Sequence, residues 1–325
     1  MKLPVYADVA RAGERLAGVA VRTPLLQNAT LDALTGGRIL LKPECLQRVG
    51  AFKLRGAYNR IADVDREAFP GGVVACSSGN HAQGVAAAAA LLGHRAAVVM
   101  PADAPALKIE RTRSLGAEVV LYDREREDRD AIARAIGAER RADFIHPFDD
   151  AGVIAGQGTV GLEIVADVRA LGAALDAVLV PCSGGGLASG IALAAKHDDP
   201  RIEVHTVEPH GFDDFARSLA AGERLANARV SGSIADALMA PSPGRIAFAI
   251  GSALFGPGLV VTDAEMRAAM RFAFAELKLV LEPGGAAALA ALLTGRYDAR
   301  GRTVAVVLSG GNVDDASFGA VIAGA

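Results

Sequence analysis

The sequence predicts a parallel α/β fold. Short runs rich in β-branched residues alternate with alanine-rich stretches, a pattern typical of strands that alternate with helices. The short runs are apolar almost without interruption, which indicates strands buried on both faces of a sheet. Hydrophobic residues make up 51% of the 325 residues, so the chain can bury a sizeable core. The length suits roughly two domains.

The elements can be placed along the chain from these patterns. Strands are expected at residues 72–76, 96–100, 118–122, 177–181, 203–207, 259–261 and 303–308. A helix over residues 79–92 would end at Gly93, and another over residues 107–115 would end at Gly116, because glycine is favoured just past a helix end. Thr262 and Glu265 have capping-box spacing, which predicts a helix that runs to about residue 276.

Composition and charge exclude several classes of protein. Net charge is −3, with 34 basic residues scattered among 37 acidic ones, so neither a nucleic-acid partner nor a membrane partner is expected. No signal peptide is visible, and the longest uncharged apolar stretch, residues 246–261, is shorter than a bilayer span. Cys45, Cys76 and Cys182 show no metal-ligand spacing. We therefore expect a cytoplasmic protein.

Lys53 is a candidate nucleophile. It follows Phe52 and lies between Gly50 and Gly56. A lysine forms a Schiff base with an aldehyde only when its amine is neutral, and burial lowers the pKa of the amine in that direction. A lone lysine is more often an ordinary exposed residue. In the company of the motifs below, the hypothesis is that Lys53 binds a cofactor aldehyde and that Phe52 packs against the cofactor ring.

A second motif, Ser77-Ser78-Gly79-Asn80-His81, follows an expected strand and opens an apolar helix. The first amides of a helix have no partner within the helix and bind anions. The motif therefore predicts a site for a substrate carboxylate, in which the Asn80 side chain could bond a phenolic oxygen of the cofactor. A serine N-cap with a surface asparagine is the alternative explanation.

A third motif is rich in glycine and also follows an expected strand. Successive glycines let backbone N–H groups converge on a phosphate without obstruction by side chains, which predicts a phosphate site at Ser183, Gly184, Gly185, Gly186 and Leu187. A dinucleotide site is the competing interpretation, with Glu208 as the acidic ribose binder. That fingerprint needs a glycine at its sixth position, where Ser189 stands, so phosphate binding is favoured.

The fourth motif begins at Ser309 and ends the last expected strand. A serine hydroxyl can donate to a pyridine nitrogen without protonating it, which suits β-elimination better than reactions that need a long-lived carbanion. A glycine turn after a buried strand is the alternative. The four motifs together offer partners for an aldehyde, a phosphate, a phenolic oxygen and a pyridine nitrogen. They predict pyridoxal 5'-phosphate as the cofactor.

With these motifs, the chain resembles the serine/threonine dehydratase and serine racemase family of pyridoxal-phosphate enzymes, which have the tryptophan synthase β fold type. The resemblance covers nearly the whole chain and includes Arg22-Thr-Pro-Leu-Leu26, Lys42-Pro-Glu44, His146-Pro-Phe-Asp-Asp150, Ile154-Ala-Gly-Gln-Gly158 and Glu282-Pro-Gly-Gly-Ala286. It implies fold type II, with two parallel-rich three-layer α/β/α domains and the cofactor in the cleft between them. It places the larger domain at residues 1–70 and 151–325, and a smaller domain with the carboxylate loop at residues 71–150.

The resemblance also implies roles for individual residues. Lys53 would hold the cofactor and then take the α-proton, and Ser78 would be a second acid/base on the opposite substrate face. Glu208, Asp214 and the carbonyl of Phe212 would match the family's site for a divalent cation (Mg²⁺, Ca²⁺ or Mn²⁺). The residue types agree, because hard cations prefer oxygen ligands, although two carboxylates in a loop are usually only solvated. Relatives are commonly dimers or tetramers, so a homo-oligomer is expected.

The activity implied is that of a lyase, which dehydrates and deaminates L-threonine or L-serine to a 2-keto acid and ammonia. A serine or aspartate racemase and a threo-3-hydroxyaspartate ammonia-lyase would use the same catalytic residues. A nucleotide-binding oxidoreductase or a non-catalytic binding protein is the remote alternative. Arg129 could recognise a second substrate carboxylate, or it could be a surface residue in a charged run.

Three departures from the family pattern bear on these expectations. Ser183 replaces the first of the usual four glycines, and Ala237 stands where relatives often have glycine. The alanine would reshape the wall that faces the substrate side chain. The chain continues for about a dozen residues after Asn312, so the regulatory domain of biosynthetic threonine dehydratases, and feedback by isoleucine, are not expected.

Overall fold

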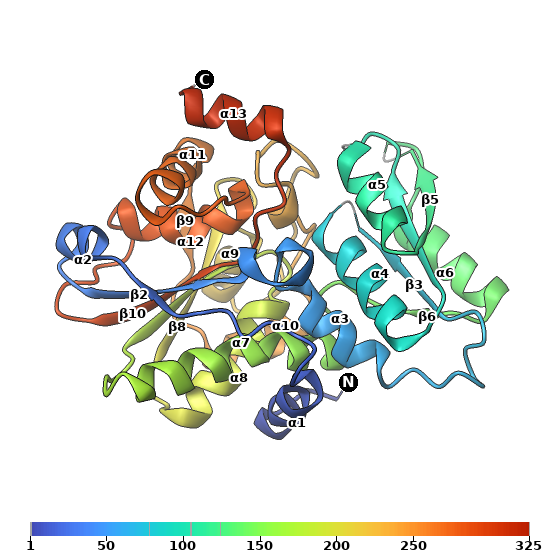
Figure 1. Ribbon diagram of the computed structural model, residues 1–325, viewed down its shortest axis with the longest axis horizontal. Coiled ribbons are helices and arrows are strands. Elements are labelled where there is room, and N and C mark those ends of the chain that lie inside the picture. Colours follow the sequence, from blue (N-terminus) through green and yellow to red (C-terminus); the bar gives the residue numbers. More distant parts are fainter. Residues whose placement is uncertain (1, 78, 105, 124, 325) are drawn as a thin grey trace.

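The computed structural model describes residues 2–77, 79–104, 106–123 and 125–324. Two separate sheets organise the chain, and helices cover both faces of each (Figure 1). The predicted α/β fold with parallel-rich sheets is confirmed.

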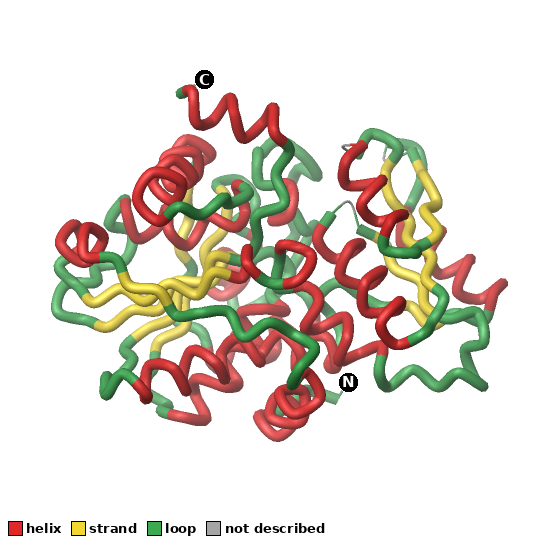
Figure 2. Tube along the Cα trace, in the orientation of Figure 1, coloured by secondary structure: helices red, strands yellow, loops and turns green. Residues whose placement is uncertain are grey.

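The larger sheet has six strands, which are yellow in Figure 2. Their order is β1 (Leu26–Gln27), β2 (Arg38–Pro43), β10 (Thr303–Leu308), β7 (Ala177–Pro181), β8 (Glu203–Pro209) and β9 (Leu259–Val261). The edge strand β1 is antiparallel to β2, and every other pair is parallel. Parallel strands end at the same edge of a sheet, so the loops after β7, β8 and β10 lie near one another.

Strand residues alternate between two helical layers. Ile39 and Val306 pack with α2 (Ala29–Thr35), α11 (Asp263–Phe272) and α12 (Pro283–Leu293). Leu40 and Val307 pack on the other face with α7 (Ala151–Ala170) and α8 (Gly186–Asp198). This alternation is the period of two that a strand imposes. α1 (Tyr6–Leu16) packs against α7, and α13 (Asp315–Ala323) packs against α11.

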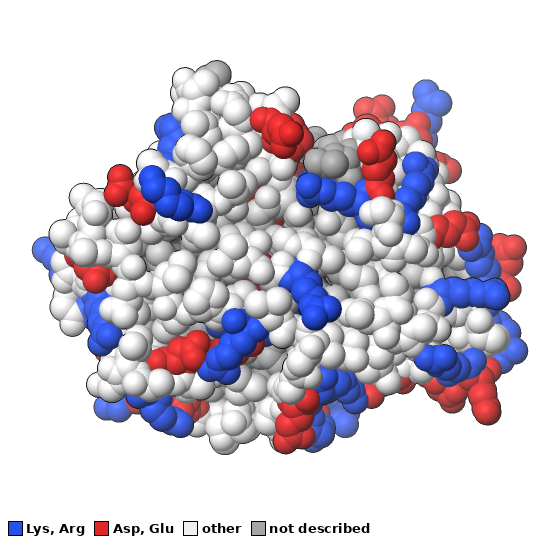
Figure 3. All heavy atoms as spheres, viewed as in Figure 1, with Lys and Arg blue, Asp and Glu red and all other residues white. Residues whose placement is uncertain are grey.

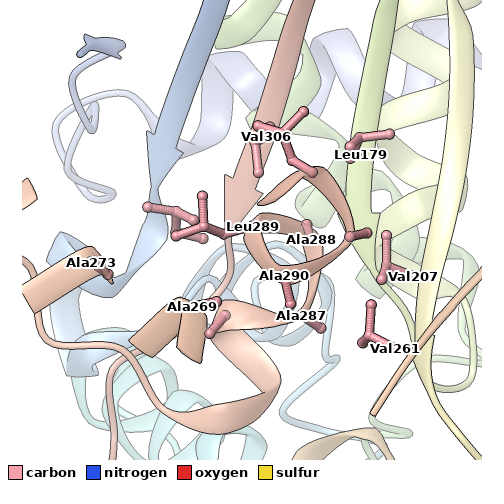
Figure 4. Packing of buried hydrophobic residues seen from close by; sticks show 14 of the residues in the cluster. Leu179, Val207, Val261, Ala269, Ala273, Ala287, Ala288, Leu289, Ala290 and Val306 are labelled. Atoms are coloured by element: carbon pink, nitrogen blue, oxygen red, sulfur yellow. The ribbon is translucent and has the colours of Figure 1, made fainter. Parts of the chain in front are cut away.

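Helix α12 lies close to the larger sheet because the residues on its buried side are small. Figure 4 shows it against the strands, with Ala287, Ala288, Leu289 and Ala290 of the helix near Leu179, Val207, Val261 and Val306 of the sheet. All of these side chains are fully buried. The tight packing fixes the start of α12, where Glu282 is the N-cap residue.

The smaller sheet has four parallel strands in the order β5 (Glu118–Tyr122), β4 (Ala96–Pro101), β3 (Val73–Cys76) and β6 (Asp143–Phe144). α4 (Asn80–Leu92) and α5 (Ala106–Ser114) cover one face, and α6 (Arg129–Arg140) covers the other. Between the two sheets runs α3 (Lys53–Ile61), which packs on both α4 and α7 (Figure 1). The division into domains at residues 71–150 stays a prediction.

Most expected strands form where the sequence predicts them. β5, β7, β9 and β10 have the predicted bounds, whereas β3 begins one residue later and β4 and β8 extend further. β1, β2 and β6 were not expected, and two of them are only two residues long, too short to leave a pattern. The capping box at Thr262 and Glu265 is present. The helix ends at Phe272, and a π-helical turn (Ala273–Leu277) continues it.

Charged side chains of both signs are mixed on the surface. On the face shown in Figure 3, basic and acidic side chains are interspersed. Among the described residues, α7 is the one helix long and apolar enough to cross a membrane. It packs against α1, α3 and α8, and this internal packing accounts for its apolar composition.

Candidate active site

One pocket collects residues from all four motifs. It is lined by the start of α3, the β3–α4 loop, the β7–α8 loop, the end of β10 and the segment that carries the short helix Asp236–Leu238. The predicted residues in this lining are Phe52, Lys53, Ser77, Gly79, Asn80, His81, Ser183, Gly184, Gly185, Gly186, Leu187 and Ser309. Ser78, the predicted second acid/base, lies outside the described residues.

Lys53 is the first residue of α3 and directs its amine into this pocket. The amine donates a hydrogen bond of 2.8 Å to the carbonyl oxygen of Pro147, and it lies 5.1 Å from the centre of the Phe52 ring. Burial lowers the pKa of Lys53 to about 8, although the Glu282 carboxylate opposes this shift. The amine therefore loses its proton more readily than that of an exposed lysine, as a nucleophile and base requires.

A second lysine, Lys108, also lines the pocket but is less suited to that task. Its amine forms a salt bridge of 2.7 Å with Asp236. Burial pushes its pKa down, but the carboxylates around it outweigh burial, and the net pKa is raised. Lys108 thus stays a cation, whereas no salt bridge to Lys53 occurs among the described residues. Of the two lysines in the pocket, Lys53 has the environment of a reactive amine.

The β3–α4 loop presents the start of a helix to the pocket. Ser77 accepts a hydrogen bond of 3.1 Å from the Gly79 N–H, and α4 begins at Asn80. The first N–H groups of α4 point toward the pocket end of the helix and favour an anion there. Burial, together with the charge of Lys53, lowers the pKa of His81 to about 3, so its ring is neutral. The ring contacts the Ile145 carbonyl at 3.0 Å.

The glycine-rich loop has no room for side chains. A Cβ at Gly184 would lie 2.2 Å from the Phe148 ring, and one at Gly185 would lie 2.2 Å from the Phe215 ring. Gly185 has φ +92°, which favours glycine, and α8 begins at Gly186. Packing from behind thus presses bare backbone toward the pocket at a helix N-terminus. This arrangement fits the phosphate of pyridoxal phosphate.

Replacing Gly185 by alanine is expected to lower the affinity for pyridoxal phosphate about ten-fold or more, because overpacking by one methyl group costs about 1–3 kcal/mol. Titration of the cofactor-free protein by visible absorbance measures the affinity. Gly172 is the matched control: it also has a positive φ, +64°, but a Cβ there meets nothing within 4 Å. Unchanged affinity in Gly185→Ala would contradict the assignment of this loop.

Ser309 completes the set at the end of β10. Its side chain is buried and lines the pocket, and its carbonyl oxygen accepts a hydrogen bond of 3.2 Å from the Phe52 N–H. That bond ties the end of β10 to the start of α3, so the hydroxyl and the Lys53 amine keep a fixed relation. The roles of these residues toward the cofactor stay predictions. Their placement fits the aldehyde, the phosphate, the phenolic oxygen and the ring nitrogen of pyridoxal phosphate.

Several lining residues received no role from the sequence. They are Lys108, Pro147, Phe148, Asp236 and Glu282. Arg129, for which the sequence left two alternatives open, also lines the pocket. Two of the family-like segments, at residues 146–150 and 282–286, contain Pro147, Phe148 and Glu282. The likeness of these segments to the family was the signal that the sequence offered, but it gave the three residues no chemical role. Pro147 acts through a backbone carbonyl, and no side-chain pattern announces a carbonyl.

A buried charge network fixes α3 from the side away from the pocket. Arg55, two residues after Lys53, donates to Glu44 at 2.8 Å and to Glu163 at 2.7 Å. Lys42 lies 2.7 Å from Glu163. Arg55, Glu44 and Lys42 are almost completely buried, so each charge depends on the others for compensation. The network holds the first turn of α3, and hence Lys53, against β2 and α7.

The predicted metal ligands lie outside the pocket, behind the glycine loop. Glu208 is the last residue but one of β8 and accepts hydrogen bonds from the N–H groups of Phe215 (2.9 Å) and Ala216 (2.7 Å). One oxygen of Asp214 binds Asn227 at 2.6 Å, and the other is buried with no hydrogen-bond partner among the described residues. No group of three His, Cys, Asp or Glu side chains in the described part of the chain is placed to hold a metal ion. The metal site, with the Phe212 carbonyl as third ligand, stays a prediction.

The chemistry of these two carboxylates nevertheless fits a hard cation. Burial, and then the charge of Asp214, raises the pKa of Glu208 well above its usual range, and burial raises the pKa of Asp214 to about 6. If a divalent cation binds here, a chelator is expected to lower the melting temperature by roughly 5 °C, and Asp214→Asn should abolish that effect. An unchanged melting temperature with chelator would contradict the site.

Comparison with known proteins agrees with this pocket. Residues 17–310 match the family model described as pyridoxal-phosphate dependent enzyme. The chain is 41% identical to an L-threo-3-hydroxyaspartate ammonia-lyase of Pseudomonas sp., over 100% of both chains. It superimposes on the crystal structure of a T.th. threonine deaminase with a TM-score of 0.90 and 44% identity, covering 96% of this chain and 99% of the other. The structure of maize serine racemase gives a TM-score of 0.92 and 36% identity, covering 99% and 98%. The chain belongs to the pyridoxal-phosphate-dependent enzymes of fold type II.

Proposed function

We propose that the protein is a lyase that dehydrates and deaminates a small β-hydroxy amino acid, L-threonine or L-serine, to a 2-keto acid and ammonia. The observation that carries the proposal is the shared pocket of Lys53 and the start of α4. An amine with a lowered pKa faces the same space as an anion-binding helix N-terminus. An amino acid held there by its carboxylate would present its α-carbon to the amine.

Each protein group would have one task in this reaction. The bound cofactor supplies an electron sink for the α-carbon. Lys53 acts as the base that takes the α-proton from the substrate. The backbone at the start of α4 holds the carboxylate, which fixes the orientation of the α C–H bond and thereby selects proton removal. The Ser309 hydroxyl would donate to the ring nitrogen of the bound cofactor without charging it, which favours rapid loss of the β-hydroxyl over a long-lived carbanion. The β-hydroxyl would leave as water with a proton from a nearby acid, and water would then hydrolyse the released enamine to the 2-keto acid and ammonia.

A 2-keto acid assay on purified protein loaded with pyridoxal phosphate tests the proposal. L-threonine, L-serine, D-serine and L-threo-3-hydroxyaspartate are offered side by side. Rapid keto acid formation from L-threonine or L-serine would support it. If none of the four yields keto acid while the protein is visibly coloured, the lyase proposal is wrong, and chiral analysis of the serine samples then tests for a racemase.

One observation favours threo-3-hydroxyaspartate as a second candidate substrate. Arg129 is the first residue of α6 and lines the pocket near Ser77. Its side chain is 41% exposed, and its salt-bridge partner among the described residues, Asp130, lies 3.6 Å away. That pair is loose, so the guanidinium can take a second carboxylate in a charge-assisted contact. The lyase of Pseudomonas sp. named above acts on this dicarboxylate.

Replacing Arg129 by glutamine is expected to raise the KM for threo-3-hydroxyaspartate about ten-fold or more, and to change the KM for L-serine little. A hydrogen bond between charged groups is worth about 1.5–3 kcal/mol, which corresponds to that factor. Arg126→Gln is the matched control, because Arg126 belongs to the same charged run but does not line the pocket. Equal effects on both substrates would show that Arg129 does not select the second carboxylate.

A homo-oligomeric state and a cytoplasmic location stay predictions. Light scattering on the purified protein measures the first.

A further inference from the structure

Glu282 is a buried acid at the wall of the cofactor pocket to which no role is assigned above. It is the N-cap residue of α12 and is 2% exposed. Its Oε1 lies 2.5 Å from the Asn80 Nδ2, and its Oε2 has no hydrogen-bond partner among the described residues. A Cβ at Gly310 would lie 2.2 Å from Oε1, so the carboxyl group packs against the backbone next to Ser309. An unpaired oxygen at this depth is costly unless it serves the site.

Hydrogen bonds on both sides of Asn80 determine which way its amide points. The Nδ2 of Asn312 donates to the Val49 carbonyl at 2.7 Å, and a carbonyl can only accept, so the orientation of Asn312 is fixed. The same Nδ2 donates to the Asn80 Oδ1 at 2.8 Å. The amino group of Asn80 is therefore left to face Glu282 and the pocket. Glu282 accepts a hydrogen bond from this amino group. It thereby stabilises the orientation of Asn80 in which the amino group points away from Asn312.

Titratable and charged groups face Glu282 from several surrounding elements. Nearest in effect are Lys53 of α3, Lys108 of α5, Asp236 before α12 and Cys45 after β2. Arg111 of α5 and Asp314 before α13 line a second pocket together with Glu282. Lys108 and Asp236 neutralise each other in their salt bridge of 2.7 Å. Lys53 instead donates to a neutral carbonyl. Lys53 therefore has no ion pair among the described residues, and Glu282 is attracted by both Lys108 and Lys53, more strongly by Lys108.

Burial acts on these two groups in opposite directions. It raises the pKa of Glu282 to about 7, against the attraction of Lys108 and other neighbours, and it lowers the pKa of Lys53 to about 8. Each group's charge favours the charge of the other. Burial thus brings the pKa values of the two groups close together.

We propose that Glu282 is a positioning residue that aims the Asn80 amide into the pocket and supplies the counter-charge for Lys53. When the Lys53 nitrogen is a cation, whether bonded to the cofactor or carrying the proton it has removed, ionised Glu282 stabilises it. When Lys53 is a neutral base, burying a protonated, neutral Glu282 costs less free energy than burying an ionised one. The proposal depends on the assignment of Lys53 to the cofactor, and it is independent of which amino acid is the substrate.

The first test is a pH titration of the visible absorbance of the protein loaded with pyridoxal phosphate. Glu282→Gln keeps the size and an acceptor oxygen for Asn80, but it removes the charge. The pH at which the cationic Lys53 linkage loses its proton is expected to fall by about one unit, the lower end of what a close opposite charge contributes. Glu282→Asp keeps the charge and is expected to restore most of that shift.

The second test measures Lys53 itself after the cofactor has been removed, in protein whose absorbance returns when the cofactor is added back. Trace acetylation followed by peptide mass spectrometry gives the pH dependence of Lys53 reactivity, with the exposed Lys2 as internal reference. Glu282→Gln should lower the apparent pKa of Lys53. Asp298→Asn is the control, because it removes an exposed, ion-paired carboxylate that does not line the pocket, and it should leave that pKa in place.

The two tests separate the proposal from its alternatives. A Lys53 pKa that falls in Glu282→Gln, but not in Glu282→Asp or Asp298→Asn, supports the counter-charge. Equal shifts in Glu282→Gln and Glu282→Asp would mean that shape alone matters and would overturn it, as would unchanged titrations in Glu282→Gln. Neither readout requires turnover, so a wrong substrate in the keto acid assay would leave this result intact.

Discussion

Replacing Lys53 by alanine is expected to give a colourless protein that makes keto acid at least about a thousand-fold more slowly. The change removes both the amine that bonds the cofactor and the base that takes the α-proton, and a positioned base alone contributes about 10²–10⁴-fold. No other described lysine can substitute from its present place, because Lys108 is held by Asp236 and Lys42 is buried beside Glu163. Absorbance spectra and the keto acid assay measure the two losses.

Lys108→Ala is the control for this experiment, because it removes a second amine from the same pocket. That variant should stay coloured, since its amine is ion-paired and its pKa is raised. A coloured and active Lys53→Ala protein would show that another lysine holds the cofactor. A colourless Lys108→Ala protein with coloured Lys53→Ala would reassign the role to Lys108.

Replacing Arg55 by methionine is expected to lower the free energy of unfolding by about 3–5 kcal/mol, the typical cost of breaking a buried ion pair from one side. Methionine fills similar space but leaves Glu44 buried without its cation, while Glu163 keeps Lys42. Thr23 would still donate to Glu44 at 2.7 Å, which compensates only in part. Such a loss is a large share of the 5–15 kcal/mol that typically separates folded from unfolded protein.

Urea unfolding of the cofactor-free protein measures this loss without the contribution of bound cofactor. Arg201→Met is the matched control, because the Arg201–Asp199 pair is exposed and should contribute little to stability. Equal and small effects of both substitutions would mean that the buried network does not hold α3, and that Lys53 is positioned by apolar packing alone.

The four cofactor motifs could be found from the sequence because each is local. In three of them an expected strand leads into or ends at the motif, and in all four the chemistry lies in contiguous residues, as in Ser183 to Leu187. The carboxyl ends of parallel strands bring such loops to one edge, so a prediction of the fold also brings the motifs together. The structure places all of the predicted pocket residues that it describes in one lining.

The remaining parts of the site depend on contacts between distant residues. Glu282 and Asn80 are 202 positions apart, and Lys53 reaches a carbonyl 94 positions away. From the sequence, a single glutamate before a helix, such as Glu282, indicates only the start of that helix. The residues next to it indicate no chemical role in a pocket. Arg129 also depends on a distant contact. The sequence around it is a charged run that leaves open whether it binds substrate or lies on the surface, and the packing of α6 beside β3 puts its side chain at the pocket.

Borohydride reduction of the protein loaded with pyridoxal phosphate, followed by peptide mass spectrometry, tests the central claim most directly. Reduction fixes the cofactor covalently to whichever lysine holds it. The account predicts a single modified peptide, with the cofactor on Lys53, and none in the Lys53→Ala protein. A modified Lys108, or modification that persists in Lys53→Ala, would contradict the assignment on which the proposed reaction is built.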